Sequence, residues 1–149
     1  MSRHVVAQNR KALRDYELVD RLEAGIVLEG TEVKSIREHG ASLKESFARI
    51  VDGEVWLENC HIAPYSHGNI QNHQPRRSRK LLLHRRQINK LFGSTQKSGL
   101  TLIPVRMYLS SGRVKVELAL ARGKRKYDKR ETARRKAIQR DIESALKDR

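Results

Sequence analysis

The sequence predicts a mainly β fold, in which a small closed or partly open barrel with short helices is followed by a basic tail. The chain has 149 residues, which is enough for one sizeable core but leaves two independent domains thin. Segments with alternating or β-branched apolar residues recur between turn sequences, as in β-strands. From Arg122 onward basic residues dominate and the apolar stripe is thin. We therefore expect a barrel over residues 1–121 and a tail over 122–149 that is disordered when free and helical when bound.

The first third of the chain predicts one strand and one helix. Residues 1–14 have no strong periodicity and are expected to fray. Residues 16–28 contain β-branched and alternating apolar positions and predict a strand bulged near Gly25. Residues 30–40 predict a short helix that Thr31 caps and a final glycine ends.

A hairpin follows. Residues 47–51 and 54–57 flank Asp52-Gly53, a dipeptide typical of tight β-turns, and predict two antiparallel strands. Residues 62–65 are expected to extend this sheet. Residues 66–75 are rich in Gly, Asn, Gln and His and predict a loop.

The remaining elements complete the predicted barrel. Residues 85–92 predict a second helix that Gly93 ends. Residues 100–109 and 113–121 predict a second hairpin, joined by a Ser-Ser-Gly turn. About six strands with two short helices, one of them between strand groups, fit a barrel of the oligonucleotide-binding (OB-like) type.

Charge is the strongest compositional signal. Lys and Arg number 32 against 17 Asp and Glu, which gives a net charge of +15. The excess is uneven, because residues 59–116 contain eleven basic residues and no acidic one, whereas residues 1–58 are slightly acidic. Such a field attracts nucleic acid, an acidic membrane surface or an acidic protein. No apolar run is long enough for a membrane span and the start of the chain is polar, so we expect a cytoplasmic protein with no membrane partner.

The sequence Arg76-Arg77-Ser78-Arg79-Lys80 is the densest basic run before the tail. In an extended segment alternate side chains point to opposite sides, so Arg77 and Arg79 share one side and Lys80 lies on the other. Either side could meet phosphate. The alternative, a solvated charged loop, stays open, although a loop built only for solubility usually mixes both signs.

Histidine and cysteine do not indicate an enzyme. His61, His67, His73 and His84 lack nearby carboxylates that could hold a divalent metal, so we expect loop histidines that hydrogen-bond or touch phosphate, no metal and no cofactor. A metal-free nuclease that uses paired histidines stays open. Cys60 is the only cysteine, so it can form no internal disulfide and is expected in the core.

Several longer sequences resemble a known family. Glu23-Ala24-Gly25-Ile26, Gly30-Thr31-Glu32-Val33-Lys34-Ser35, Arg79-Lys80-Leu81-Leu82-Leu83 and the segment from Gly123 to Glu131 occur in this order. Together they resemble small protein B, the SsrA-binding protein of bacterial trans-translation, over nearly the whole chain. The resemblance implies an OB-like barrel, no catalytic step, and transfer-messenger RNA (tmRNA) and the stalled ribosome as partners of a monomeric protein.

The resemblance also implies contact residues. In that family the barrel grips the elbow of the tRNA-like domain, and the matching positions are Glu23, Leu82 and Lys115. Their chemistry suits a carboxylate that accepts from base or ribose donors, an apolar contact to an unstacked base, and a phosphate-facing ammonium. Arg77, Arg79 and Lys80 are added as phosphate contacts from the basic run.

The tail has its own expected partner. Tyr127 stands among basic residues with no apolar neighbour, which favours stacking on a base. The resemblance implies that Tyr127, Asp128, Lys129 and Arg130 contact the decoding centre of the small subunit while the rest of the tail follows the empty messenger channel. Some relatives have histidine in place of Tyr127, so stacking rather than protonation is the shared property. Certain relatives have an aromatic residue in place of Ile138, which leaves open how deeply the tail is anchored.

Two other classes of function fit part of the sequence. A structural ribosomal protein would also be strongly basic, but it would stay at one copy per ribosome through salt washing. A histidine nuclease would cleave RNA and lose that activity when His61 or His84 is changed.

Overall fold

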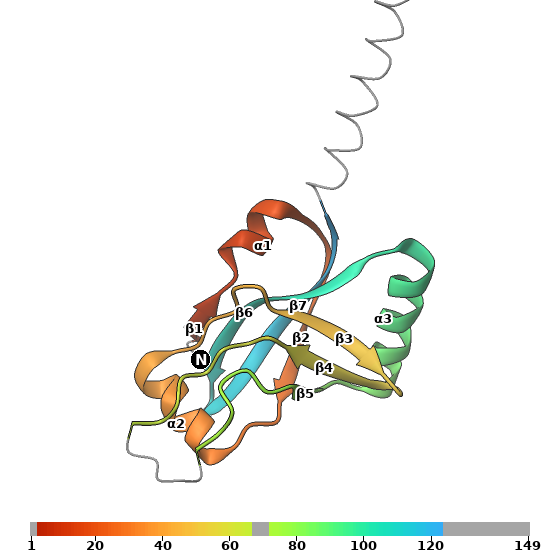
Figure 1. The fold of residues 1–149 in the computed structure, drawn as a ribbon. Coiled ribbons are helices and arrows are strands. Elements are labelled where there is room, and N and C mark those ends of the chain that lie inside the picture. Colours follow the sequence, from red (N-terminus) through yellow and green to blue (C-terminus); the bar gives the residue numbers. More distant parts are fainter. Residues whose placement is uncertain (1–2, 67–71, 124–149) are drawn as a thin grey trace, which may run out of the picture.

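The computed structural model describes residues 3–66 and 72–123, and within them it has seven strands and three helices. The strands are β1 (His4–Gln8), β2 (Tyr16–Ile26), β3 (Phe47–Val51), β4 (Glu54–Glu58), β5 (Arg79–Leu82), β6 (Thr101–Ser110) and β7 (Arg113–Gly123). The helices are α1 (Arg10–Asp15), α2 (Gly30–His39) and α3 (Arg85–Ser98). Figure 1 shows α1 and the end of β7 at one end of the molecule and α2 at the other. The predicted mainly β fold is confirmed, with one more strand and one more helix than expected.

Six strands close into a ring in the order β6-β3-β4-β5-β2-β7 and back to β6, while β1 pairs with β6 as a seventh strand. Between β3 and β6 the ring is closed by a single pair, Ala48 opposite Leu102, so it is less regular than an even barrel. β2 pairs with β7 along most of its length but with β5 only at Gly25 and Ile26. Gly25 therefore has a neighbouring strand on each side.

The turns that the sequence predicts are present. Asp52 and Gly53 adopt φ angles of 52° and 76° between β3 and β4, and Ser111 and Gly112 adopt 52° and 76° between β6 and β7. Gly40 ends α2 with a φ of 71°. These left-handed conformations are inexpensive for glycine and tolerated by Asp, which explains why local sequence predicted them.

The interior of the ring is apolar. The strands alternate, so that one side chain points inward and the next points outward. Inward residues with at most 1% exposure include Ala24, Val55, Leu57, Leu81, Val116 and Leu118. Cys60 is also buried in this core, as predicted, and burial raises the pKa of its thiol to about 11.

A second, smaller core lies on the outside of the ring under α1. Ala12 of α1 packs with Ile103 and Val105 of β6 and with Ala119 and Ala121 of β7. β6 and β7 are covered on both faces here, which explains why the sequence at this end of each strand is almost continuously apolar. The prediction that the opening segment frays is therefore wrong for residues 3–14, which contain β1 and most of α1 and are held by packing.

Two predictions about strands are also wrong. Residues 62–65 form no strand, and the first of them bonds through its backbone N–H to the carbonyl of Pro75 in the following loop, at 3.0 Å. The irregularity of β2 lies between Leu18 and Asp20, not at Gly25.

The helices differ from prediction at their ends. α2 begins after Glu29, whose backbone N–H donates to the Glu32 side chain at 2.8 Å, so Thr31 is not the cap. α3 passes through Gly93 and ends at Gly99, which has a φ of 62°. A glycine within a helix costs about 1 kcal/mol, and burial of apolar side chains of α3 against the ring outweighs that cost.

The boundary predicted between residues 121 and 122 falls inside β7, which continues to Gly123. Residues 124–149 lie outside the described residues, so the division into barrel and tail stays a prediction. Among the helices that the structure describes, none has the length and apolar character of a membrane span.

Candidate RNA-binding surface

Leu82, Gly25 and Lys115 lie side by side on three neighbouring strands. Gly25 of β2 is opposite Leu82 of β5 on one side and opposite Lys115 of β7 on the other. Directly opposed residues share one face of a sheet, and this face is the outer one, because Ala24 and Leu81 point into the core. Glu23 precedes Gly25 by two positions and therefore lies on the same face. The fold thus brings together three predicted contact residues from distant parts of the chain.

The glycine makes this row a hollow. A Cβ atom added to Gly25 would lie 3.3 Å from the Cβ atom of Leu82, so any larger residue would crowd that side chain. The hollow, which we call the Gly25 groove, has a volume of about 290 Å³. Its walls include Leu28, Val33, Leu82, Arg113 and Lys115. Leu82 is 52% exposed, which is a high value for a leucine.

Glu23 is oriented by two neighbours. Its Oε2 atom accepts a hydrogen bond from the hydroxyl of Tyr108 and lies 3.5 Å from the guanidinium of Arg3, which also stacks 4.8 Å above the Tyr108 ring. Burial raises the pKa of Tyr108 to about 12, and the hydrogen bond to Glu23 adds to this. Among the described residues nothing bonds to Oε1 of Glu23, so that oxygen is left to accept from another molecule.

The positive charge beside the groove is uncompensated within the described residues. Lys115 and Arg113 point outward from β7 and have no acidic partner there. By contrast, Glu117 two positions further along is neutralised, because Arg106 lies 3.0 Å and Arg21 lies 3.4 Å from its carboxylate. The groove end of β7 is therefore its cationic end.

The basic run at residues 76–80 contributes less than expected. Arg79 is fully buried and its guanidinium donates to the Glu32 carboxylate at 2.5 Å and to the carbonyls of Cys60 and Pro75 at 2.7 and 3.0 Å. Such a side chain has no surface to offer a phosphate. The prediction that Arg79 contacts RNA is wrong, and Arg79 instead joins β5 to α2.

Arg77 shares this acid, as the alternation of side chains predicted. Its guanidinium donates to Glu32 at 2.5 Å and to the carbonyl of Val27 at 3.3 Å, and its side chain is 26% exposed. Burial alone would raise the pKa of Glu32, but hydrogen bonds from Arg77, the N–H of Glu29 and Arg79 hold it below its ordinary value of 4.5. The carboxylate therefore stays charged between its two arginines.

The other side of the run also meets acids. Lys80 lies 3.0 Å from Glu54 of β4, and the hydroxyl of Ser78 donates to Glu58 at 2.6 Å. Both members of the Lys80–Glu54 pair are more than one-third exposed, so the pair adds at most about 1 kcal/mol. Lys80 lies on the same face as Leu82, two positions away.

Three of the four histidines considered in the sequence are described, and each has its own surroundings. His73 is buried, where its Nε2 donates to the carbonyl of Ile62 and its Nδ1 accepts from the hydroxyl of Thr31, each at 2.9 Å. His84 precedes α3 and His61 pairs with Ser42 in an isolated bridge. No group of three potential metal ligands is present among the described residues.

Five of the predicted residues cannot be placed. His67, Tyr127, Asp128, Lys129 and Arg130 lie outside the described residues.

The comparisons with known proteins agree with each other. The protein-family model for the SmpB protein matches residues 6–148. The chain is 56% identical over 145 residues to the SsrA-binding protein of Geobacillus thermodenitrificans, which covers 97% of this chain and 94% of that protein. It is 53% identical over 144 residues to the SsrA-binding protein of Fervidobacterium nodosum, which covers 96% and 97%.

A solved structure is similar as well. It is described as "tmRNA-SmpB: a journey to the center of the bacterial ribosome", matches with a TM-score of 0.66 at 50% identity, and covers 78% of this chain and 82% of that one. With a family model matched over nearly its whole length and relatives more than half identical to it, this chain belongs to the SmpB protein family.

Proposed function

We propose that this protein binds the tRNA-like domain of tmRNA and delivers it to stalled ribosomes for trans-translation. The names of its relatives and of the similar solved structure support this function. The observation that carries it is the row of Leu82, Gly25 and Lys115, which offers an apolar surface, a hollow and a cation on one outer face.

Each part of this surface has a distinct task. The exposed Leu82 packs against an unstacked base at the edge of the Gly25 groove, and Lys115 with Arg113 faces the phosphates on either side of that base. The free Oε1 atom of Glu23 accepts from a base or ribose donor, while Tyr108 and Arg3 hold the carboxylate in place.

Two residues of the basic run belong to the periphery of this surface. Lys80 faces outward near Leu82 and adds a phosphate contact when it leaves Glu54. The guanidinium of Arg77 is bound to Glu32, and only the 26% of the side chain that is exposed can contact RNA.

The tail is proposed to act on the ribosome. Tyr127, Asp128, Lys129 and Arg130 contact the decoding centre, and the following residues occupy the empty messenger channel. The supporting observation is the composition of residues 122–149, where basic residues outnumber acidic ones and Tyr127 has charged neighbours on both sides. The body holds an RNA without an anticodon arm, and the tail replaces that arm.

We also propose that the protein is a cytoplasmic, monomeric, non-enzymatic factor that uses no cofactor. Purified full chain incubated with tmRNA should leave the RNA intact, and a cleavage rate that disappears in His84→Ala would overturn this part. A permanent ribosomal protein would remain at one copy per ribosome after a high-salt wash, whereas this protein is expected to be substoichiometric and to co-purify with one small RNA.

Leu82→Ala is expected to weaken binding to the isolated tRNA-like RNA roughly five- to tenfold, because covering the exposed half of a leucine side chain contributes about 1 to 1.5 kcal/mol. Lys115→Ala is expected to weaken binding and to make the dependence of log K on log salt shallower by about 0.9, the value for one lost phosphate contact. Both effects are measured by equilibrium binding across a salt series.

Phe92→Ala serves as the control, because Phe92 is 48% exposed on α3, away from the Gly25 groove, and resembles Leu82 in exposure. Equal losses in Phe92→Ala and Leu82→Ala would mean that the effect is not specific to the groove.

A further inference from the structure

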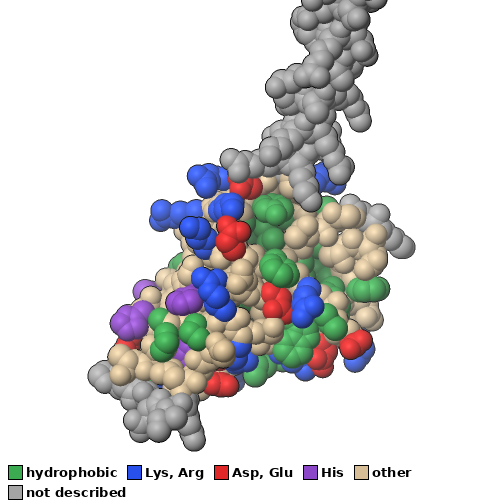
Figure 2. All heavy atoms as spheres, viewed as in Figure 1, with side chains coloured by type: hydrophobic (Ala, Val, Ile, Leu, Met, Phe, Trp, Pro, Cys, Tyr) green, Lys and Arg blue, Asp and Glu red, His purple; other side chains and the backbone are tan. Residues whose placement is uncertain are grey.

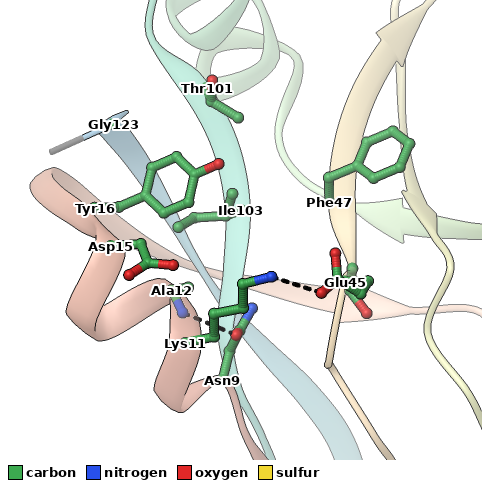
Figure 3. A pocket seen from close by; sticks show the side chains of 11 residues that line it. Asn9, Lys11, Ala12, Asp15, Tyr16, Glu45, Phe47, Thr101, Ile103 and Gly123 are labelled. Atoms are coloured by element: carbon green, nitrogen blue, oxygen red, sulfur yellow. Dashed lines mark hydrogen bonds and ion pairs between the residues drawn. The ribbon is translucent and has the colours of Figure 1, made fainter. Parts of the chain in front are cut away.

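A second hollow lies at the opposite end of β2 and β7 from the Gly25 groove. It has a volume of about 540 Å³ and is lined by α1, by the segment before and including the start of β3, and by the ends of β2, β6 and β7. Figure 3 shows Tyr16 on one side of this hollow and Phe47 on the other, with Asp15 and Thr101 around the same space. We call it the α1 pocket. Gly123, the last described residue of β7, also lines it.

Neither of these two aromatic side chains is fully buried in a core. Phe47 is 44% exposed, while its neighbour Ala48 is the residue of β3 that is buried in the ring. Tyr16 packs only partly on the small core under α1, and its hydroxyl has no hydrogen bond among the described residues. Two aromatic walls that face a shared opening are suited to a flat ring between them.

The walls of the α1 pocket are held in place by bonds within the chain. The side chain of Asn9 accepts from the backbone N–H of Ala12 at 3.1 Å and donates to the carbonyl of Pro104 at 3.0 Å, which fixes α1 on β6. The ammonium of Lys11 lies 2.7 Å from Glu45 and joins α1 to the segment before β3. The pocket is therefore formed before any ligand enters.

A cationic groove continues from the α1 pocket. This groove has a volume of about 330 Å³, shares Asn9 and Lys11 with the pocket, and is lined by Arg10, Arg14 and Lys44. None of these three has an ion-pair partner among the described residues. Figure 2 shows Lys and Arg side chains gathered over α1, with acidic side chains among them. An anion-binding groove that opens into an aromatic pocket matches the phosphate and the base of one nucleotide.

We propose that the α1 pocket binds an unstacked nucleotide of the small-subunit ribosomal RNA. The base lies between Tyr16 and Phe47, and Asp15 accepts a hydrogen bond from its edge. The adjacent phosphates lie against Arg10, Arg14 and Lys44.

The position of the α1 pocket favours ribosomal RNA as the ligand. Tyr16 and Gly25 are nine positions apart on β2, which is about 30 Å at the rise of a strand, so the pocket faces an RNA segment other than the one in the Gly25 groove. Gly123, after which the rest of the tail follows in sequence, lines the pocket. The proposed function assigns the tail to the small subunit, and this inference rests on that assignment.

The first test is binding of the full chain, with tmRNA, to purified small ribosomal subunits. Phe47→Ala is expected to lower the affinity for the subunit at least about fivefold, as loss of one stacked base would. The double variant Arg10→Gln/Arg14→Gln is expected to make the salt dependence shallower by about 0.7 for each lost contact to single-stranded RNA. Neither variant should change affinity for the isolated tRNA-like RNA.

Matched controls come from α3. Phe92→Ala removes a phenylalanine of similar exposure, and Arg86→Gln/Lys90→Gln removes two cations that are also four positions apart on a helix. If the control variants weaken subunit binding as much as the pocket variants do, the inference is overturned. A loss of tmRNA binding by Leu82→Ala is measured separately, so failure of the proposed function and failure of this inference give different results.

The second test identifies the ligand. In full chain carrying Phe47→p-benzoylphenylalanine, irradiation on the ribosome is expected to produce a crosslink to small-subunit RNA that primer extension maps to a single region. A crosslink only to tmRNA, only to the chain itself, or to no molecule would overturn the proposal.

Discussion

Replacing Glu32 by Gln is expected to lower the free energy of unfolding by about 3 to 5 kcal/mol. Glu32 is fully buried and receives the guanidinium groups of Arg77 and Arg79, and Arg79 is fully buried as well. Glutamine keeps the shape of the side chain but leaves a buried guanidinium charge without its counter-ion. Urea unfolding, followed by circular dichroism and the fluorescence of Trp56, measures the change.

Glu38→Gln is the control for this prediction, because Glu38 is exposed on the same helix and lies 3.5 Å from His39 only. It is expected to change stability by no more than about 0.5 kcal/mol. If Glu32→Gln were equally mild, the buried ion pairs would not be holding β5 on α2.

The same carboxylate predicts a pH dependence. Because the pKa of Glu32 is lower in the folded protein than its ordinary value of 4.5, its contribution to stability is complete above that value. The contribution is lost as the pH falls through the lower folded pKa. The difference in stability between the natural chain and Glu32→Gln should therefore be constant near neutral pH and shrink in acid.

Truncation after Lys126 is expected to leave binding to the tRNA-like RNA unchanged and to abolish rescue of stalled ribosomes. The Gly25 groove is built entirely from residues before Gly123, so the RNA that binds there should not need the tail. The decoding centre contacts proposed for Tyr127 to Arg130 are all removed. RNA affinity is measured by equilibrium binding, and rescue by peptide tagging on ribosomes stalled at the end of a truncated messenger.

Circular dichroism of the truncated chain is the control that the ring still folds. Loss of RNA binding in a folded truncated chain would contradict the division of labour between barrel and tail, and retained tagging would contradict the role of the tail.

Local signals predicted local structure well. The Asp52-Gly53 and Ser111-Gly112 turns and the end of α2 at Gly40 depend on backbone conformations that a few residue types favour, so they can be read from sequence. The apolar alternation predicted the long strands β6 and β7 within two residues of their ends. Packing between distant segments could not be read in this way. The ordered N-terminal segment depends on Ala12 covering Ile103, about 90 positions away.

The partners of the charged residues could not be predicted from local sequence either. The run from Arg76 to Lys80 has no acid near it in sequence, yet the fold supplies Glu32, Glu54 and Glu58 from earlier elements. One signal was available for Glu32: it lies four positions before Ile36, so both share the buried face of α2. A carboxylate on a buried helix face requires a cationic partner, and the run from Arg76 to Lys80 is the densest source of cations before the tail.

Three of the expected contact residues lie on one face of the ring. Glu23, Leu82 and Lys115 were expected as contact residues from a family resemblance, and strand register brings them together around Gly25. Their contact with RNA stays a prediction. The α1 pocket could not be foreseen, because it is made by α1 covering one end of the ring, and that segment was expected to fray.

Binding of the tRNA-like RNA at the Gly25 groove is tested most directly by amide chemical shifts of the full chain, recorded with and without that RNA. We predict that the largest changes occur at residues 23–26, at Leu82 and at residues 113–116. Unchanged shifts at these positions, with large changes confined to α3 or to the α1 pocket, would contradict it.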